Sequence, residues 1–241
     1  MKLFKNFCSL PLLIPGVFNL INSLFKKKSN GFICCWHDLS AEIFQSHIEA
    51  LQPNKPIPLD ELTERLKSGK STSGCYALTF DDGVGSTVRD ISNKCIQKGW
   101  PVTFYLPTQY LDEGILPYQN SKPISWSEVE ELSKNQLISF QSHGVTHSAV
   151  SSLNEEEIEL EMTKSKKIIE SHTNKKVHSF CYPYGSKESI GNMAPKVAAK
   201  HFSSAVTLIH GRLKKNDLFY LPRIGLYKED LRSLARLKTL I

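Results

Sequence analysis

The chain has 241 residues, of which 40% are hydrophobic and 22% charged, so it can bury one sizeable core and is not a disordered, collagen-like or repetitive protein. Its formal net charge of +6 comes from short, scattered lysine runs, which argues against a nucleic-acid partner and leaves weak attraction to anionic membranes or acidic glycans. We therefore expect a single domain over residues 31–241, preceded by an N-terminal extension over residues 1–30.

The extension over residues 1–30 is apolar and basic. Two lysines precede an apolar stretch over residues 10–18, which superficially resembles the start of a signal peptide. Prolines and a glycine interrupt this stretch, no small-x-small cleavage site is evident, and the run is far shorter than the roughly 20 residues that span a membrane. We expect a helix that packs on the domain or contacts a membrane peripherally through residues 1–28, in a protein of the cytoplasm or the inner membrane surface.

The cysteine pattern indicates free thiols. The six cysteines form no C-x-x-C pair and no spacing typical of a zinc knuckle or a disulfide framework. Buried free thiols are therefore expected, which favours a reducing compartment.

Strands and helices alternate along the domain. We expect strands over residues 32–36, 76–80, 102–106, 138–141, 179–182, 204–207 and 220–226. We expect helices over residues 41–51, 59–67, 88–98, 127–134, 155–171 and 193–201. Ser125 and Asn154 are the N-cap signals for two of these helices. The alternation predicts an α/β fold with a parallel sheet or barrel.

Polar residues gather where the predicted strands end. The residues that lie just past a strand are His37, Asp38, Asp81, Asp82, His143 and Tyr184. In parallel α/β folds, catalytic groups collect at the carboxyl ends of the strands. We therefore expect these side chains to line one site.

Asp81 and Asp82 are adjacent carboxylates at the end of an apolar strand, followed by Gly83. Neighbouring aspartates repel each other when both are ionised and buried, so such a pair usually needs a cation or a shared proton. A surface Asp-Gly turn with nothing to bind fits the same residues. The pair alone leaves both interpretations open.

His143 and His147 follow the strand over residues 138–141 at a spacing of four residues. An i, i+4 pair on one helical turn can place two imidazoles on a common metal. With the two aspartates they supply one carboxylate and two neutral nitrogens for a divalent ion, leaving positions for water and substrate. The same donors also describe the facial triad of non-haem iron oxygenases, which the barrel-like rhythm and the adjacent aspartates disfavour.

A Pro183-Tyr184-Gly185 turn follows the strand over residues 179–182. Such a turn serves either as simple punctuation between elements or to aim a backbone N–H at a developing oxyanion. The turn alone does not separate these two interpretations.

Together these motifs resemble those of the polysaccharide deacetylases of carbohydrate esterase family 4, which include chitin and peptidoglycan N-deacetylases. The match consists of residues 79–83 for the first motif, His143-x-x-x-His147 for the second and residues 183–185 for part of the third. It covers roughly residues 75–226. The resemblance implies a distorted (β/α) barrel of about seven parallel strands.

The resemblance also implies roles and chemistry. Asp81 would be the general base, and the backbone N–H of Tyr184 would contribute to the oxyanion hole. The implied metal ligands are Asp82, His143 and His147. The implied cofactor is a divalent metal, zinc first, with cobalt, nickel or manganese as alternatives. The implied substrate is an N-acetylated amino sugar in a polysaccharide, a glycoconjugate or a lipid-linked form.

Two departures from the family pattern concern the third and fourth motifs. Cys181 stands where many members have the arginine that orients the catalytic aspartate. Arg223 is a candidate substitute, and an ordinary surface or structural arginine fits the sequence equally well. No fourth motif of the usual Asp/Trp type is evident. A catalytically impaired carbohydrate-binding relative therefore remains an alternative. An O-deacetylase on a glycan is a second alternative, because the sequence does not reveal whether the linkage is N-acetyl or O-acetyl.

The catalytic acid has two candidate histidines. The string over residues 208–210 fits the C-terminal Leu-x-His of many members, but it follows Gly185 too soon for the usual order. The segment over residues 35–38 is similar to the N-terminal Tyr-His element of the biofilm poly-N-acetylglucosamine deacetylases, whose motifs are circularly permuted. We therefore favour His37 over His210 as the acid.

Overall fold

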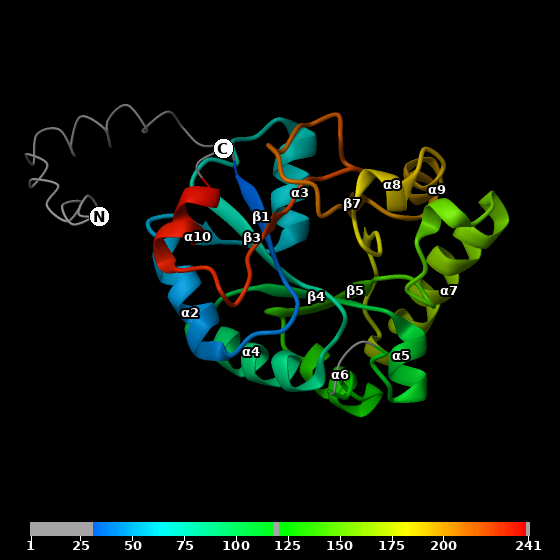
Figure 1. Ribbon diagram of the computed structural model, residues 1–241, viewed down its shortest axis with the longest axis horizontal. Helices are drawn as coiled ribbons and strands as arrows, with labels where there is room; N and C mark the ends of the chain where they lie inside the picture. The colour runs from blue at the N-terminus through cyan, green and yellow to red at the C-terminus, as the bar shows by residue number, and fades with distance from the viewer. Residues whose placement is uncertain (1–30, 118–120, 240–241) are drawn as a thin grey trace, which may run out of the picture.

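The computed structural model of the protein describes residues 31–117 and 121–239 (Figure 1). The N-terminal helix and the domain boundary that the sequence predicts at residue 30 lie outside these residues. Within the described ranges, no helix combines the length and the apolar character that crossing a bilayer requires.

One parallel sheet forms the centre of the fold. Its strands are β1 (Phe32–Trp36), β2 (Lys55–Pro56), β3 (Cys75–Phe80), β4 (Val102–Leu106), β5 (Ile138–Ser142), β6 (Ser179–Cys181), β7 (Ser204–Val206) and β8 (Ile224–Gly225). Seven of them follow the order β7-β6-β5-β4-β3-β1-β8, and β2 pairs with β3 outside this path. All pairings between these strands are parallel.

The sheet curls until its two ends meet in the segment that contains β8. Leu221 forms a parallel bridge with β7, and β8 pairs with β1 a few residues later. Pro222 lies between the two contacts and has no N–H to donate, which breaks the strand predicted over residues 220–226 into a bridge and a two-residue strand. The expected distorted barrel of about seven parallel strands is confirmed.

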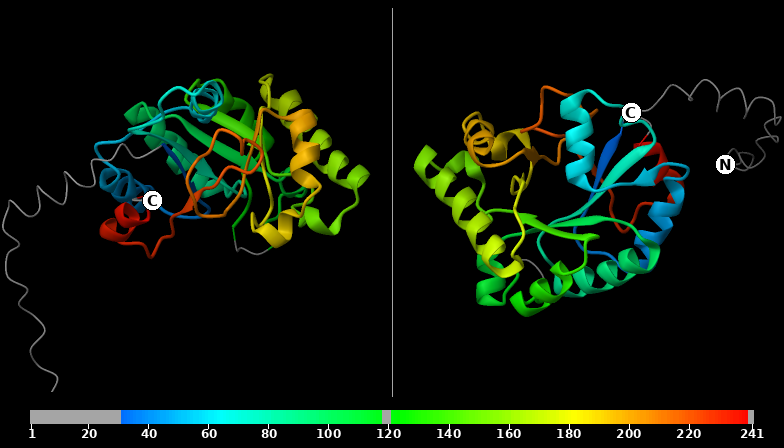
Figure 2. Two further views of the ribbon diagram at one scale, coloured as in Figure 1. Left: turned by 90° about the horizontal axis from the view of Figure 1, so that it is seen from above. Right: turned by 180° about the vertical axis from the view of Figure 1, so that it is seen from behind.

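The helices flank the curled sheet, most of them along its outer side (Figures 1 and 2), while the helix at Leu59–Ser68 packs Leu59 and Leu62 with the inward-facing Ile33 and Ala77. The helices are α2 (Ala41–Ala50), α3 (Leu59–Ser68), α4 (Gly85–Lys98), α5 (Thr108–Glu113), α6 (Trp126–Ser133), α7 (Glu155–Thr173), α8 (Lys187–Ile190), α9 (Ala194–His201) and α10 (Arg232–Lys238), with a 3₁₀ turn at Val150–Ser152. The six predicted helices are confirmed within a few residues at each end. Ser125 and Asn154 each form a full capping box, as their sequence signals predicted.

Alternation along the strands separates side chains that face the helices from those that face the barrel interior. On β1, Trp36 packs in the larger core between the sheet and the helices, whereas Ile33 belongs to a smaller cluster inside the barrel. On β3, Ala77 belongs to the inner cluster, and Thr79 and Asp81 follow it in steps of two residues. The inward phase of β3 therefore ends on a carboxylate at the rim of the barrel.

Candidate active site

A cavity of about 200 Å³ lies at the carboxyl ends of the parallel strands. Its lining residues are His37, Asp81, Asp82, His143, His147, Tyr182, Tyr184, Leu208 and Arg223. The polar residues that the sequence places past strand ends are therefore brought together. Asp38 differs, because its carboxylate accepts a hydrogen bond from Thr87 at 2.7 Å and does not line the cavity.

Asp82 and the two histidines form a compact set of metal-ligating atoms. Asp82 Oδ1 lies 3.6 Å from His143 Nε2 and 3.3 Å from His147 Nε2, and all three side chains are buried. Within the described chain, this buried oxygen accepts no hydrogen bond. A buried carboxylate oxygen without a donor is costly unless a cation balances it. One carboxylate and two imidazoles, with donor atoms within 4.8 Å of one another, therefore fit a small divalent cation.

His143 is oriented by the backbone so that Nε2 faces Asp82. Its Nδ1 lies 2.8 Å from the carbonyl oxygen of Cys181, an arrangement in which Nδ1–H donates and Nε2 is left for a metal. Burial alone lowers the pKa of His143, but its contacts with Cys181 and Asp82 outweigh burial and raise it. The raised pKa shows that the surroundings of His143 favour positive charge, so a proton and a divalent cation would compete for Nε2.

The other two members of the set have shifted pKa values as well. Burial lowers the pKa of His147, which favours the neutral imidazole that binds metals. Burial alone raises the pKa of Asp82, but the neighbouring imidazoles outweigh it and hold that pKa well below its ordinary range. Asp82 is therefore ionised at neutral pH, as a metal ligand must be.

The loop that carries the two histidines is not helical, so the interpretation of a shared helical turn is wrong. β5 ends at Ser142, and the next helical residue is Val150 in the 3₁₀ turn. Gly144 has φ 81° and His147 has φ 59°, both in the left-handed region. A turning loop, and not the rise of a helix, places the two ring centroids 4.8 Å apart.

Asp81 forms a bidentate ion pair with Arg223, the residue that the sequence offered as a candidate substitute for the missing third-motif arginine. Nη1 donates to Oδ1 at 2.7 Å and Nη2 donates to Oδ2 at 2.6 Å. The guanidinium also donates to the carbonyl of Thr207 at 2.8 Å and to the hydroxyl of Thr79 at 3.1 Å. Arg223 is 1% exposed and Asp81 3%. Burial alone raises the pKa of Asp81, but Arg223 outweighs it and holds that pKa well below its ordinary range.

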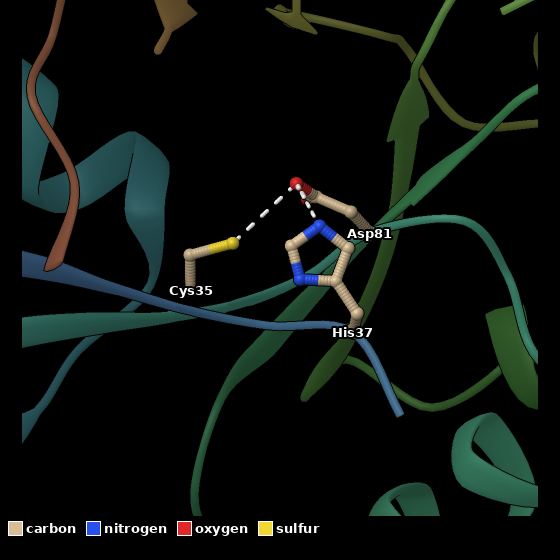
Figure 3. A group of neighbouring side chains, drawn as sticks. All are labelled: Cys35, His37 and Asp81. Atoms are coloured by element: carbon tan, nitrogen blue, oxygen red, sulfur yellow. Dashed lines mark hydrogen bonds and ion pairs between the residues drawn. The ribbon is translucent and has the colours of Figure 1, made fainter. Parts of the chain in front are cut away.

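Two thiols that the sequence analysis did not assign to the site lie beside the Asp81 carboxylate. The Sγ atoms of Cys35 and Cys181 lie 3.4 and 3.6 Å from Asp81 Oδ2. Burial raises the pKa of both thiols, so they are neutral neighbours. Figure 3 shows that Cys35 and His37 approach the same carboxylate oxygen. The positive charge of Arg223 already balances that carboxylate, so it would repel a metal cation bound among Cys35, His37 and Asp81.

The described cysteines are free thiols, as expected. Four of them are buried and Cys75 is half-buried. The remaining one, Cys8, lies outside the described residues.

His37 lies at the site and His210 does not. His37 Nε2 is 3.8 Å from Asp81 Oδ2, and its side chain is 36% exposed at the cavity. His210 is exposed, lies outside the lining of this cavity, and has its Nε2 3.1 Å from the carbonyl oxygen of Lys238. The favoured candidate for the acid is therefore the one that can reach a substrate in this cavity.

Tyr184 lies in a turn that only glycine can complete. Tyr184 and Gly185 both have φ 62°, in the left-handed region. A Cβ on Gly185 would lie 2.4 Å from the backbone nitrogen of Leu208, which donates to the Gly185 carbonyl at 2.9 Å. Tyr184 is 61% exposed, and the centroid of its ring lies 5.0 Å from that of His147. Tyr184 thus lines the cavity beside His147, a member of the candidate donor set.

Residues 68–201, more than half of the chain, match the family model described as polysaccharide deacetylase. Among curated proteins, no match to the chain is found. The family match covers both aspartates, both histidines and the Pro-Tyr-Gly turn, while His37 and Arg223 lie outside it.

Solved structures share the fold. The Streptococcus pyogenes deacetylase PplD in complex with acetate has a TM-score of 0.74 at 18% identity, covering 87% of this chain and 97% of that one. IcaB from Ammonifex degensii has a TM-score of 0.71 at 18% identity, covering 86% and 97%. The de-N-acetylase from Aggregatibacter actinomycetemcomitans has a TM-score of 0.68 at 18% identity, covering 88% and 98%.

Proposed function

The chain belongs to the polysaccharide deacetylase family, and on that premise we propose that it is a metal-dependent hydrolase that removes acetyl groups from N-acetylated amino sugars of a polysaccharide or glycoconjugate. The observation that carries this proposal is one cavity in which the donor set of Asp82, His143 and His147 adjoins Asp81 and His37. This cavity combines a cation site with a base and an acid, which amide hydrolysis requires.

The metal would be held by Asp82, His143 and His147, and zinc suits their carboxylate and imidazole donors best. Cobalt, nickel and manganese accept the same donor types. When bound, a divalent cation would lower the pKa of a water molecule from 15.7 to about 7 and polarise the acetyl carbonyl.

Asp81 would take a proton from the water that attacks the acetyl carbonyl. Arg223 fixes both of its oxygens and keeps it ionised, so it can accept a hydrogen bond from that water. A carboxylate of such low pKa holds the extra proton only briefly. His37, with Nε2 3.8 Å from the same carboxylate, is close enough to take part in the next proton transfer.

The tetrahedral oxyanion and the departing amine need their own partners. The backbone N–H of Tyr184 would donate to the oxyanion from the turn that Gly185 makes possible. His37 would protonate the sugar amine as the carbon–nitrogen bond breaks, because an amine is a poor leaving group without that proton. The products are acetate and a free amino sugar.

Replacing His37 by alanine should lower acetate release by about 10²-fold, the lower end of the range for general acid catalysis. We expect the lower end of this range because the His37 side chain is 36% exposed, so water can partly replace it as the proton donor. His210→Ala is the matched control, because that histidine lies outside the cavity. Steady-state acetate release by the two variants measures this difference, and an equal loss in both would contradict the assignment.

The N-acetyl linkage is favoured over an O-acetyl ester. A similar structure is named a de-N-acetylase, and an acid such as His37 matters most when the leaving group is an amine. A non-catalytic carbohydrate-binding relative is disfavoured by the buried Asp81–Arg223 pair, which sugar or metal binding alone would not require.

A metal-supplemented acetate-release screen tests the proposal. The substrates are N-acetylglucosamine polymers, lipid-linked amino sugars and O-acetylated glycans, each with and without Zn²⁺. We expect acetate from an N-acetylated substrate, with the rate depending on metal. Acetate from O-acetylated glycans alone would point to an esterase. Zinc-dependent binding of chito-oligosaccharide with no acetate from any substrate would indicate the binding relative.

A further inference from the structure

The loop between β5 and α7 carries both histidines of the donor set in an irregular conformation. Gly144 and His147 have positive φ, and no regular element supports the residues between them. Such a loop needs contacts from neighbouring elements to hold two imidazoles in a fixed relation. These contacts come from α7, which follows the loop, and from α5.

Glu161 on α7 reaches into the loop with one carboxylate oxygen. Its Oε2 accepts from the backbone N–H of Val145 at 2.8 Å and from that of Thr146 at 3.0 Å. A Cβ on Gly144 would lie 2.9 Å from the same oxygen, so this approach also explains the glycine. The carboxylate thus bonds the two consecutive N–H groups that lie near the middle of the span from His143 to His147.

The flanks of the loop are anchored separately. Ser165, one turn further along α7, has its hydroxyl 2.6 Å from that of Ser142 at the end of β5. On the other side, the N–H groups of Thr108 and Gln109 donate to the carbonyls of Gly144 and Val145 at 3.1 and 3.0 Å. The loop carbonyls therefore bond α5, and its N–H groups bond Glu161.

We propose that Glu161 is a positioning residue, which fixes the loop so that His143 and His147 already face Asp82 before a metal binds. This inference rests on the proposed metal site. Glu161 is not among the residues that line the cavity, and its carboxylate bonds the backbone of Val145 and Thr146, through which it acts on the two histidines. Bonds from N–H groups to a carboxylate are charge-assisted, which makes this a strong brace for a half-buried side chain.

Metal affinity of the full chain tests the proposal. Zn²⁺ affinity is measured by competition with a chromogenic chelator, starting from metal-free protein. Glu161→Ala should bind Zn²⁺ about 10–100-fold more weakly, the loss typical of partners that orient metal ligands. Glu161→Gln should recover most of this loss, because the amide oxygen can still accept from both N–H groups. Glu159→Ala, on the same helix, removes the surface pair with His201 and should bind Zn²⁺ as the wild type does.

Amide hydrogen exchange in metal-free protein provides a second readout. The N–H groups of Val145 and Thr146 should exchange faster in Glu161→Ala than in the wild type, with little change elsewhere on α7. If the alanine variant does not fold, Glu161→Asp replaces it, since the shorter side chain keeps the charge and loses reach, and weaker Zn²⁺ binding is again expected.

Wild-type affinity and exchange in the folded variant would overturn the role of Glu161, whether or not the protein releases acetate. Conversely, a wild type that binds Zn²⁺ and releases no acetate would refute the proposed function and leave the comparison of variants intact. The two failures are therefore distinguishable.

Discussion

Asparagine in place of Asp81 should leave metal binding intact and lower acetate release by about 10²–10⁴-fold. The amide keeps the size of the side chain but cannot take a proton from water. Asp82, His143 and His147 keep their mutual distances, because the ion pair of Asp81 with Arg223 is separate from that donor set. Bound metal per chain and the rate of acetate release are measured on the same sample.

His143→Ala is the comparison variant for Asp81→Asn, because it removes a proposed metal ligand and leaves the proposed base in place. This change removes the Nε2 that faces Asp82 and the contact of Nδ1 with the Cys181 carbonyl, so metal and activity should both be lost. If Asp81→Asn lost as much metal as His143→Ala, the two neighbouring aspartates would not divide the roles of base and ligand. If Asp81→Asn kept full activity, Asp81 would not be the base.

The fold follows from strong local signals in the sequence. The apolar run Val102–Leu106 has the predicted bounds, and the capping boxes at Ser125 and Asn154 fix where two helices begin. Weak signals fail where elements are short. The helix Lys187–Ile190 has too few residues to show a period, and Pro222 interrupts the last strand.

The two histidines of the donor set could be recognised because they lie four residues apart, whereas Asp82 is 61 positions before His143 and was linked to them by its place at a strand end and by the resemblance of the motifs. The conformation of the loop could not, because a spacing of four residues suits a helical turn and a bent loop alike. Gly144 was the available hint, since its φ of 81° is one that other residues rarely adopt. Glu161 gave no signal of its own, because an acidic residue on a long polar helix face is common.

Contacts across the barrel are the part that the sequence specifies least directly. Arg223 and Asp81 are 142 positions apart, so no local spacing links them. The sequence names Arg223 as a candidate partner of Asp81 but does not separate this role from that of an ordinary surface or structural arginine. Cys35 was missed, although the alternation along β1 puts it in phase with the inward-facing Ile33. Barrel closure brings such inward residues together at one rim.

Arg223→Met should destabilise the protein by about 3–5 kcal/mol, the cost of leaving one partner of a buried ion pair without the other. The methionine fills much of the volume but leaves Asp81 buried, ionised and without the bidentate donor. Activity should fall as well, because both oxygens of the proposed base lose their orientation. Urea unfolding at pH 7 measures the free energy of unfolding, and acetate release measures the catalytic effect.

Combining Arg223→Met with Asp81→Asn should recover much of the lost stability, since the charge that needed a partner is gone.

The pH dependence of the unfolding free energy gives an independent test of whether the Asp81 charge causes the destabilisation. In the wild type, Arg223 holds the pKa of Asp81 below the unfolded value of about 4, so the stabilisation is complete above that pH and is lost as the pH falls below it. In Arg223→Met, burial is opposed less and the pKa of Asp81 rises, so protonation relieves the variant as the pH falls. The difference in unfolding free energy between the two proteins should therefore shrink as the pH falls, first through the raised pKa of Asp81 in the variant and then below about pH 4, where the wild type loses its ion-pair stabilisation. A constant difference from neutral pH to acid would mean that Arg223 stabilises the fold by packing and not through the Asp81 charge.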